Sequence, residues 1–338
     1  MGLVCSGFLV TAGGNVVNLQ KPLFLRYGKC VFLTLGLLFC ASAARTQGPA
    51  PETAPTLFPG GVLISYNSVF VTRGLMAGIP AGIPPNARTT FSHEADFNFR
   101  WGFRRDFNLI VLIPMVTNSF RTATTPAVGG TGLGDTLVLV KYRFYRRDSE
   151  RGTTQASFTV GPKIPTGGTN LTDISGKLLP AGLQPGSGSA DLFLSANWTY
   201  TGLFNIKRLV ADEDLHSLLR SQGTQAMRLG SNLESRFWLS YRPYQSKNID
   251  REWFVGPTFT WLHYQDNRIL GANQNGSGGD VLLSGITTYA TLRPGTTVWL
   301  GLDWDIAHSS GASFRPARRH ISFGITKQFQ LHAQGKGE

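Results

Sequence analysis

Residues 91 to 104 alternate between largely aromatic and largely polar side chains, and this pattern limits what the chain can form. Successive side chains of a β-strand point to opposite faces, so the segment predicts a strand with one aromatic and one charged face. A soluble β-sandwich uses such a strand by burying the aromatic face against a second sheet. A transmembrane barrel uses it repeatedly, with lipid outside and a polar lumen inside. The odd positions hold Phe91, His93, Ala95, Phe97, Phe99, Trp101 and Phe103, and the even positions hold Ser92, Glu94, Asp96, Asn98, Arg100, Gly102 and Arg104.

The same two-residue period recurs at residues 188–201, 226–242, 298–306 and 321–329, and Phe193 is the one exception in the first of them. Most of the polar faces carry Asp, Glu or Arg at the centre of the strand, where a membrane barrel has its lumen. The sequence therefore predicts an all-β fold, an antiparallel transmembrane β-barrel of the Gram-negative outer-membrane type.

The N-terminal region has the layout of a secretory signal. Three basic residues precede an apolar core at residues 31–39, and Ala41-Ser42-Ala43 follows as a small-x-small cleavage site. The core is too short to span a bilayer comfortably, which favours cleavage over a retained anchor. We therefore expect an exported protein.

Cysteine and charge usage narrow the functional classes. Cys5, Cys30 and Cys40 all precede the expected cut, so the exported chain has no disulfide, no Cys-ligated metal and no cysteine nucleophile. The formal charge is +12 without a Lys/Arg run. We expect no nucleic-acid partner, and outer-membrane lipid and lipopolysaccharide as the surrounding anions. Beyond the N-terminal region, no run of about 18 apolar residues predicts a membrane-spanning helix.

The links between the expected strands alternate between short and long, as in barrels with short periplasmic turns and long external loops. The alternation fails once, because an odd number of strands must separate the long loop at 166–187 from the short turn at 243–250, and only two are evident. We expect the missing strand at Gly202 to Ala211, followed by an external loop through Asp212, Glu213 and Asp214; the alternative is a periplasmic helix at 212–222. The total is then about 12 strands. The others are expected at 61–72, 90–104, 107–117, 133–146, 153–165, 188–201, 225–242, 251–265, 280–292, 296–308 and 317–329.

Four segments are expected along the chain: a signal peptide at 1–44, a disordered lead-in at 45–60, the barrel at 61–329 and a tail at 330–338. The first twenty or so residues look unlike a signal. The segment from Ile321 to Phe329 is apolar at alternate positions and ends in an aromatic residue, like the last strand that the barrel-assembly machinery recognises. Here, however, the tail follows it.

Three glycine-rich motifs occur in a fixed order within the strand region. They are Gly132-Leu133-Gly134-Asp135 leading into Leu139 to Arg143, then Gly161 to Gly167 around Lys163-Ile164-Pro165-Thr166, then Gly186 to Asp191. Together they resemble the outer-membrane transporters named for the MetA pathway of phenol degradation, over most of the exported chain. The resemblance implies a barrel and transport, often of hydrophobic compounds, and it supplies no catalytic residue.

No group of residues indicates catalysis, a cofactor or a metal, and we expect no enzyme. The glycine run at 129–134 lacks the parallel strand, the Lys-Ser/Thr pair and the helix of a phosphate-binding loop. The six histidines are scattered without ligand spacing. His93 lies on the apolar face, where a lipid-facing Ser–His hydrolase would place its base, but the sequence identifies neither the nucleophile nor an orienting amide.

The polar faces of the strands are the candidate site, a lumen lined by charges of both signs. They either form a satisfied charge network that fills a narrow lumen or border a path for a solute, and a barrel of about 12 strands is wide enough for both. The favoured function is passive transport of small molecules, hydrophobic or aromatic ones among them. The alternatives are a structural or adhesive barrel acting through its external loops, and a lipid-modifying enzyme. The lumen-lining candidates are Glu94, Asp96, Arg100, Lys141, Arg143, Lys163, Asp191, Arg228, Glu234, Arg236, Asp303 and Asp305, and the side chains expected to contact lipid include Phe97, Phe99, Leu194, Leu229, Leu302 and Phe323.

Overall fold

The computed structural model describes residues 53–73, 88–122, 128–246, 251–309 and 317–330. All of them belong to one compact unit, Ala41–Glu338. The expected signal peptide, the first part of the lead-in and residues 331–338 of the expected tail lie outside the described residues. None of the described residues belongs to a helix that is long and apolar enough to cross a membrane.

Twelve antiparallel strands form a closed barrel, which confirms the predicted fold. The barrel closes because β1 pairs with β2 and β16, while β2 also pairs with β3. The strands are β1 (Gly61–Arg73), β2 (Arg88–Arg104), β3 (Phe107–Thr122), β5 (Thr136–Ser149), β6 (Gly152–Ile164), β7 (Asp191–Thr201), β8 (Leu209–Leu219), β10 (Asn232–Gln245), β11 (Glu252–Tyr264), β14 (Gly279–Arg293), β15 (Thr296–His308) and β16 (Ala317–Gln330).

Several shorter elements accompany the twelve barrel strands. The strand β4 (Val128–Leu133) pairs with the last part of β3. A separate three-stranded sheet consists of β9 (Met227–Arg228), β12 (Arg268–Ile269) and β13 (Ala272–Asn273). Three single-turn 3₁₀ helices complete the elements: η1 (Ala181–Leu183), η2 (Leu203–Asn205) and η3 (Thr224–Ala226).

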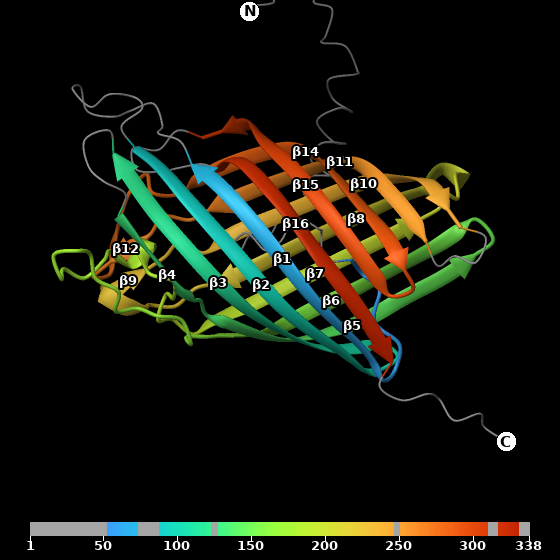
Figure 1. Cartoon of the computed structure of the whole chain (residues 1–338), viewed down its shortest axis with the longest axis horizontal. Helices are drawn as coiled ribbons and strands as arrows, with labels where there is room; N and C mark the ends of the chain where they lie inside the picture. Colours follow the sequence, from blue (N-terminus) through green and yellow to red (C-terminus); the bar gives the residue numbers. More distant parts are fainter. Residues whose placement is uncertain (1–52, 74–87, 123–127, 247–250, 310–316, 331–338) are drawn as a thin grey trace, which may run out of the picture. The chain divides into compact units, whose positions relative to one another are not determined.

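Short and long connections lie at opposite ends of the barrel, which Figure 1 shows on the right and on the left, respectively. At the short-turn end, the links are as brief as residues 105–106, 150–151 and 294–295. At the long-loop end, residues 165–190 and 265–278 connect neighbouring strands. In outer-membrane barrels the short turns are periplasmic and the long loops external, so the alternation that the sequence predicted is present.

The missing strand exists, but its predicted position is wrong. It is β8, at Leu209–Leu219, and residues 202–208 form the short turn before it. Asp212, Glu213 and Asp214 therefore lie in the wall rather than in an external loop, and residues 212–222 form no helix. Asp212 and Asp214 are buried on the inner side, whereas Glu213 lies on the outer side and accepts a hydrogen bond from Ser235 Oγ at 2.7 Å. Three consecutive acids hid the two-residue period.

The strand expected at 225–242 is also divided. Met227 and Arg228 belong to β9, and the barrel strand β10 begins only at Asn232. Gly230 lies between the two, and the position requires glycine because a Cβ atom there would come within 1.8 Å of the carbonyl oxygen of Gln265 in the neighbouring loop. Leu229, expected to contact lipid, therefore lies outside the barrel wall.

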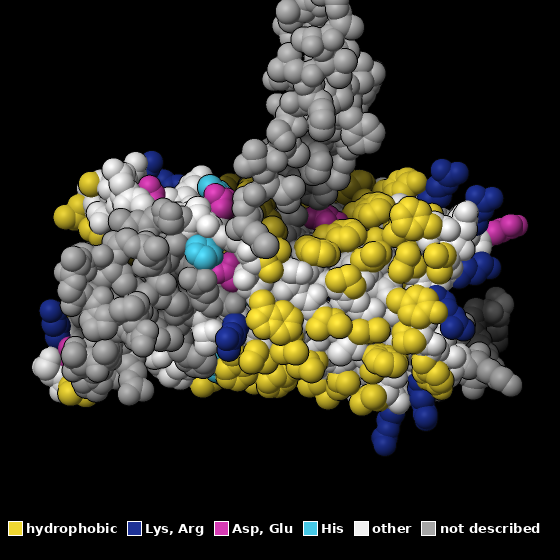
Figure 2. Space-filling view, turned by 90° about the horizontal axis from the view of Figure 1, so that it is seen from above, with side chains coloured by type: hydrophobic (Ala, Val, Ile, Leu, Met, Phe, Trp, Pro, Cys, Tyr) yellow, Lys and Arg dark blue, Asp and Glu magenta, His cyan; other side chains and the backbone are white. Residues whose placement is uncertain are grey.

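The outer face of the wall is apolar. Phe97, Phe99 and Phe323 are 53%, 40% and 42% exposed, and Leu194 lies on the same side of β7 as the exposed Trp198. Figure 2 shows hydrophobic side chains spread over the wall as a broad band, with Lys and Arg side chains beyond it at the short-turn end. A band of this kind matches the lipid-facing surface of a transmembrane barrel.

Candidate functional site

Eleven of the twelve predicted lumen residues lie on barrel strands, on the side opposite the exposed hydrophobic residues. The twelfth, Arg228, lies on β9, outside the wall. Asp96, Lys141 and Glu234 are 0% exposed. At these positions the interior is therefore filled, rather than occupied by a wide aqueous channel. The other eight are Glu94 and Arg100 on β2, Arg143 on β5, Lys163 on β6, Asp191 on β7, Arg236 on β10, and Asp303 and Asp305 on β15.

The first buried charge cluster surrounds Lys163. Its Nζ atom is 2.7 Å from Asp135 Oδ2 and 2.8 Å from Asp191 Oδ2, and all three side chains are almost completely buried. Asp135 also accepts hydrogen bonds from the Ser187 backbone N–H at 2.9 Å and from the Gly167 N–H at 3.1 Å. Gly167 and Ser187 stand near the two ends of the long loop 165–190. The cluster therefore fastens both ends of this loop to the wall.

Asp135 lies outside the strands, between β4 and β5, and its partners keep it ionised. Burial acts to raise the pKa of this carboxyl, but the Lys163 ammonium and the Ser187 hydrogen bonds outweigh it and hold the pKa below its ordinary value. The charge of Lys163 is thus matched by a carboxylate and not by a neutral acid.

The same long loop packs against the long-loop ends of β3 and β4. Leu179 and Gln184 are each 1% exposed. The Gln184 side chain donates hydrogen bonds to the carbonyl oxygens of Leu171 (2.9 Å) and Leu179 (3.0 Å), while Asn118 of β3 donates to the Gln184 carbonyl (3.3 Å). The loop therefore has a fixed structure over part of the external mouth.

A second segment occupies the interior from the opposite end. Residues 53–58, here called the lead-in segment, were expected to be disordered, but they make specific hydrogen bonds to side chains on the inner face. Ala54 is 0% exposed. Thr56 Oγ1 donates a hydrogen bond to the carbonyl oxygen of Arg105, which belongs to a short turn, so the segment lies at the short-turn end. The interior contacts run from Ala54 N to Thr199 Oγ1 (3.0 Å), from Leu57 N to Asn108 Oδ1 (3.2 Å) and from Lys141 Nζ to the Thr53 carbonyl.

The second buried charge cluster joins β8 and β10. His216 Nδ1 lies 3.0 Å from Asp214 Oδ2, and Arg236 donates to Glu234 Oε1 at 2.5 Å. His216 Nε2 and Glu234 Oε2 face each other at 3.7 Å, and neither atom has a hydrogen-bond partner in the described part of the chain. Asn197 of β7 donates to the other oxygen of Asp214 at 2.7 Å. This cluster thus pairs its charges but retains two hydrogen-bonding atoms that face each other.

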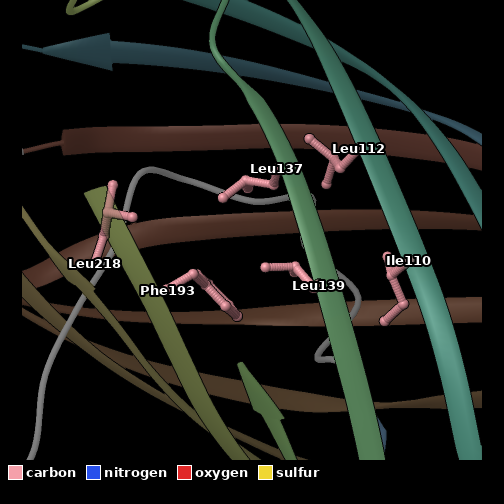
Figure 3. Close-up of a cluster of buried hydrophobic side chains, with 6 residues drawn as sticks. All are labelled: Ile110, Leu112, Leu137, Leu139, Phe193 and Leu218. Atoms are coloured by element: carbon pink, nitrogen blue, oxygen red, sulfur yellow. The ribbon is translucent and has the colours of Figure 1, made fainter. Parts of the chain in front are cut away.

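Apolar patches share the interior with these charges. Figure 3 shows one patch in which side chains from β3, β5, β7 and β8 point toward one another inside the barrel. A second patch consists of Leu262 on β11 with Val281 and Leu283 on β14, all 0% exposed. The interior of a general porin is polar, so this barrel differs in that apolar side chains pack against one another on its inner face. The first patch comprises Ile110, Leu112, Leu137, Leu139, Phe193 and Leu218.

A polar pair interrupts the apolar outer face at the position that the sequence flagged. Ser68 Oγ of β1 and His93 Nε2 of β2 are hydrogen-bonded at 2.8 Å, and Phe70 stacks on the imidazole with ring centroids 4.2 Å apart. Ser68 is 1% exposed, and no described residue bonds His93 Nδ1. A nucleophile–base pair needs an orienting partner and access for its substrate. The geometry favours a pair that satisfies its own polar atoms over a hydrolase.

The described residues contain no group of three or more His, Cys, Asp or Glu side chains placed to hold a metal ion.

Sequence reasoning missed the lead-in segment because its partners lie 51 to 145 residues away along the chain, without any local signal. It also missed Asp214 and His216. Both lie at alternate positions of β8 that face the interior, which the sequence shows only when the strand is placed at residues 209–219. Ser68 required the β1–β2 register, which pairs Phe70 with His93 and so brings the serine beside the ring.

The sequence matches none of the family models and none of the curated proteins with which it was compared. Its structure matches the COG4313 outer membrane channel from Pseudomonas putida F1 with a TM-score of 0.60 and 14% identity, over 83% of this chain and 100% of that chain. That likeness shows the fold. The β-domain of the Bordetella autotransporter BrkA (TM-score 0.44, 11% identity, 79% and 100% covered) and the NanC porin (0.40, 10%, 78% and 98%) are more distant. The chain therefore has the fold of an outer-membrane β-barrel, of the kind found in channels.

Proposed function

We propose that this protein is a passive outer-membrane channel for small hydrophobic or amphiphilic molecules. The observation that carries the proposal is the apolar side chains clustered inside the barrel, the patch around Leu112 and Phe193 above all; they are buried here, so a solute reaches them only when a segment that fills the interior moves aside. Desolvating apolar surface favours an apolar solute over water at such a wall. The charges that accompany it are largely paired with one another, so they add little attraction for ions.

The proposal includes the way in which the channel is closed. The lead-in segment occupies the short-turn half of the interior, and the loop 165–190 covers part of the long-loop end. A solute then passes only when one or both move aside. The lead-in segment has fewer fastenings: its contacts are single hydrogen bonds, whereas Asp135 and Lys163 form a buried ion pair at the base of the loop.

The proposal also covers the setting of the protein. It comprises export by the N-terminal signal, insertion by the barrel-assembly machinery, and an environment of outer-membrane lipid and lipopolysaccharide. The three glycine-rich motifs support membership of the transporters named for the MetA pathway of phenol degradation, which we propose on that resemblance.

Uptake of a hydrophobic dye by intact cells tests the function, because lipopolysaccharide slows such dyes and a phospholipid bilayer does not. We expect N-phenyl-1-naphthylamine to enter porin-deficient cells severalfold faster when they express the protein, and faster still when residues 53–58 are deleted. Leu112→Asn should slow uptake, whereas Leu178→Asn, in the exposed part of the long loop, should not. Heat-modifiable migration on gels confirms that each variant is folded.

If cells that express the wild type and cells that express the variant without residues 53–58 both take up the dye no faster than cells with the empty vector, the channel proposal is wrong. If deletion of the external loops instead abolishes a surface phenotype while uptake is absent, the structural or adhesive alternative is correct.

A further inference from the structure

A pocket of about 600 Å³ lies at the long-loop end, beside the three-stranded sheet of β9, β12 and β13. Figure 1 shows β9 and β12 together at that end of the barrel. The pocket is separate from the two buried charge clusters and from the lead-in segment, since it shares no residue with them. Its lining includes Arg228, His263, Tyr264, Asp266 and Arg268.

The loops around the pocket are tied together by hydrogen bonds. The Gly230 N–H donates to Asn267 Oδ1 at 2.8 Å, and the Gly278 N–H donates to Asp266 Oδ1 at 2.7 Å. The hydrogen bond from Gly278 is the largest cause that lowers the pKa of Asp266 below its ordinary value. The carboxylate of Asp266 is thus ionised and engaged by loop amides. These bonds hold the loop around the pocket, and among the described residues Asp266 forms no ion pair with either arginine.

Arg228 and Arg268 are direct cross-strand neighbours in the β9–β12 pair. Like charges directly opposite each other in an antiparallel pair are destabilising. In the described part of the chain neither guanidinium has a carboxylate within the 4.0 Å of an ion pair, whereas His263, also in the lining, is paired with Asp280 at 2.9 Å. Two adjacent guanidinium groups that no carboxylate engages in an ion pair are suited to bind an oxyanion, because each can do so in a bidentate manner.

Tyr264 connects this receptor to the interior of the barrel. Its ring lines the pocket and packs against the apolar patch of Leu262, Val281 and Leu283. A ligand with an anionic head and an apolar body therefore finds complementary surface for both parts. We propose that the pocket binds the carboxylate or phosphate group of a small amphiphilic molecule, with Arg228 and Arg268 holding the oxyanion and Tyr264 contacting the apolar body.

As a solute site the pocket deepens the proposed function and rests on it, because it places an anionic amphiphile at the external mouth before entry. Binding itself requires no passage through the barrel. Equilibrium binding without a gradient therefore tests the pocket, and dye uptake separately tests the channel.

Isothermal titration calorimetry of the full-length protein in phosphatidylcholine nanodiscs measures this binding. The probes are benzoate, phenyl phosphate and the neutral benzyl alcohol. We expect both anions to bind and the alcohol not to bind measurably. Arg228→Gln and Arg268→Gln should each weaken anion binding by about tenfold, because each removes charge-assisted hydrogen bonds. The double variant should abolish it. Arg151→Gln, at an exposed turn of the opposite end, is the matched control and should bind as the wild type does.

In phosphatidylcholine nanodiscs, two results would overturn the proposal: anion binding that the double variant retains, or no anion binding by a wild-type protein that heat-modifiable migration shows to be folded. A second titration, in nanodiscs that also contain lipopolysaccharide, identifies the source of the oxyanion. Unchanged benzoate affinity there supports a free solute. Loss of benzoate binding, with lipopolysaccharide retained by the wild type and released by the double variant, would show that a lipid phosphate occupies the pocket and would overturn the solute assignment.

Discussion

The outer and inner faces of the barrel wall are built by different rules. On the outer face, residues such as Phe97, Ile286 and Ile325 are 46% to 53% exposed and share only an apolar character. On the inner face, a charge such as Lys163 stands against two particular carboxylates, from a neighbouring strand and from a loop. The outer face is therefore specified by residue class and depth, and the inner face by the identity of each partner.

Two polar residues on the outer face nevertheless follow the rule of the inner face. Glu213 is hydrogen-bonded to Ser235, and Ser68 is hydrogen-bonded to His93. Both of these outward polar groups thus have a polar neighbour on the adjacent strand, which matters because an unsatisfied group facing lipid is costly. At these two positions the inner-face rule extends to the outer face, whereas Ser217 lies between Leu194 and Leu233 without a hydrogen-bond partner among the described residues.

The largest effect should follow from breaking an inner-face partnership. Lys163→Met leaves the buried carboxylates of Asp135 and Asp191 without their cation. We expect the free energy of unfolding to fall by about 3 to 5 kcal/mol, as when one partner of a buried ion pair is removed. Urea titration followed by tryptophan fluorescence measures it. Lys177→Met, on the exposed part of the same long loop, is the matched control and should change little. If both substitutions lowered the free energy of unfolding equally, the specific partners of Lys163 would not be what stabilises the inner face.

A charge on the outer face should cost less and should depend on depth rather than on partners. Leu194→Arg places a cation on the lipid side of β7, and we expect a loss of about 2 to 4 kcal/mol near the midplane. Tyr200→Arg, on the same face close to the short-turn end, should lose about 0 to 1 kcal/mol. The same unfolding titration compares them. If the variant near the end lost as much as the variant within the strand, the outer face would not be governed by depth.

The outer-face rule is why the sequence predicted so much of the fold. A two-residue period in residue class is visible without any partner, so the strands, the number of about 12 and the alternation of links followed from the sequence. The prediction failed at β8, where Glu213 on the outer side interrupts the apolar face between Asp212 and Asp214.

The inner-face rule is why the sequence predicted less of the candidate site. Parity gives the direction in which Lys163 or Glu234 points, but it does not give the partner. The sequence showed Asp135 only as part of a glycine-rich motif, although it holds Lys163 and both ends of a loop. The bond from Ala54 to Thr199 spans 145 residues, and nothing near either residue indicates it. Such contacts follow from the closed barrel and its register, which only the structure supplies.

A smaller effect should follow from breaking the polar pair on the outer face. Ser68→Ala leaves His93 Nε2 without a partner on the apolar side of the wall. We expect a loss of about 1 to 3 kcal/mol, the cost of one buried unsatisfied polar group. Adding His93→Phe should recover most of it, because replacing both partners by apolar groups is nearly neutral. Unfolding titrations of the two variants measure both steps. Labelling of the wild-type Ser68 by a fluorophosphonate would contradict this structural role and would reopen the lipid-modifying alternative.

The smallest effect concerns a loop that belongs to neither face. Asp266 accepts hydrogen bonds in the loop 265–278, and its pKa lies below the ordinary value of 3.8. A carboxyl with a lowered pKa stabilises the folded loop fully above the ordinary value, and this contribution is lost as the pH falls through the lowered one. Protection of the loop amides from hydrogen exchange, corrected for intrinsic rates, should therefore be constant from neutral pH to about pH 4 and should decline below it. In Asp266→Asn, protection should be lower at neutral pH by about twofold to tenfold, without that decline.

Asp173→Asn is the matched control for this loop. Asp173 makes the same kind of contacts within the other long loop, where Oδ1 accepts hydrogen bonds from the backbone N–H groups of Ser175 (2.8 Å) and Lys177 (3.0 Å). Its substitution should lower protection there and leave residues 265–278 unchanged. If Asp266→Asn also loosened the loop 165–190, the two loops would be coupled through the barrel. Neither would then be specified by its own hydrogen bonds, and the partner rule of the inner face would not extend to the loops.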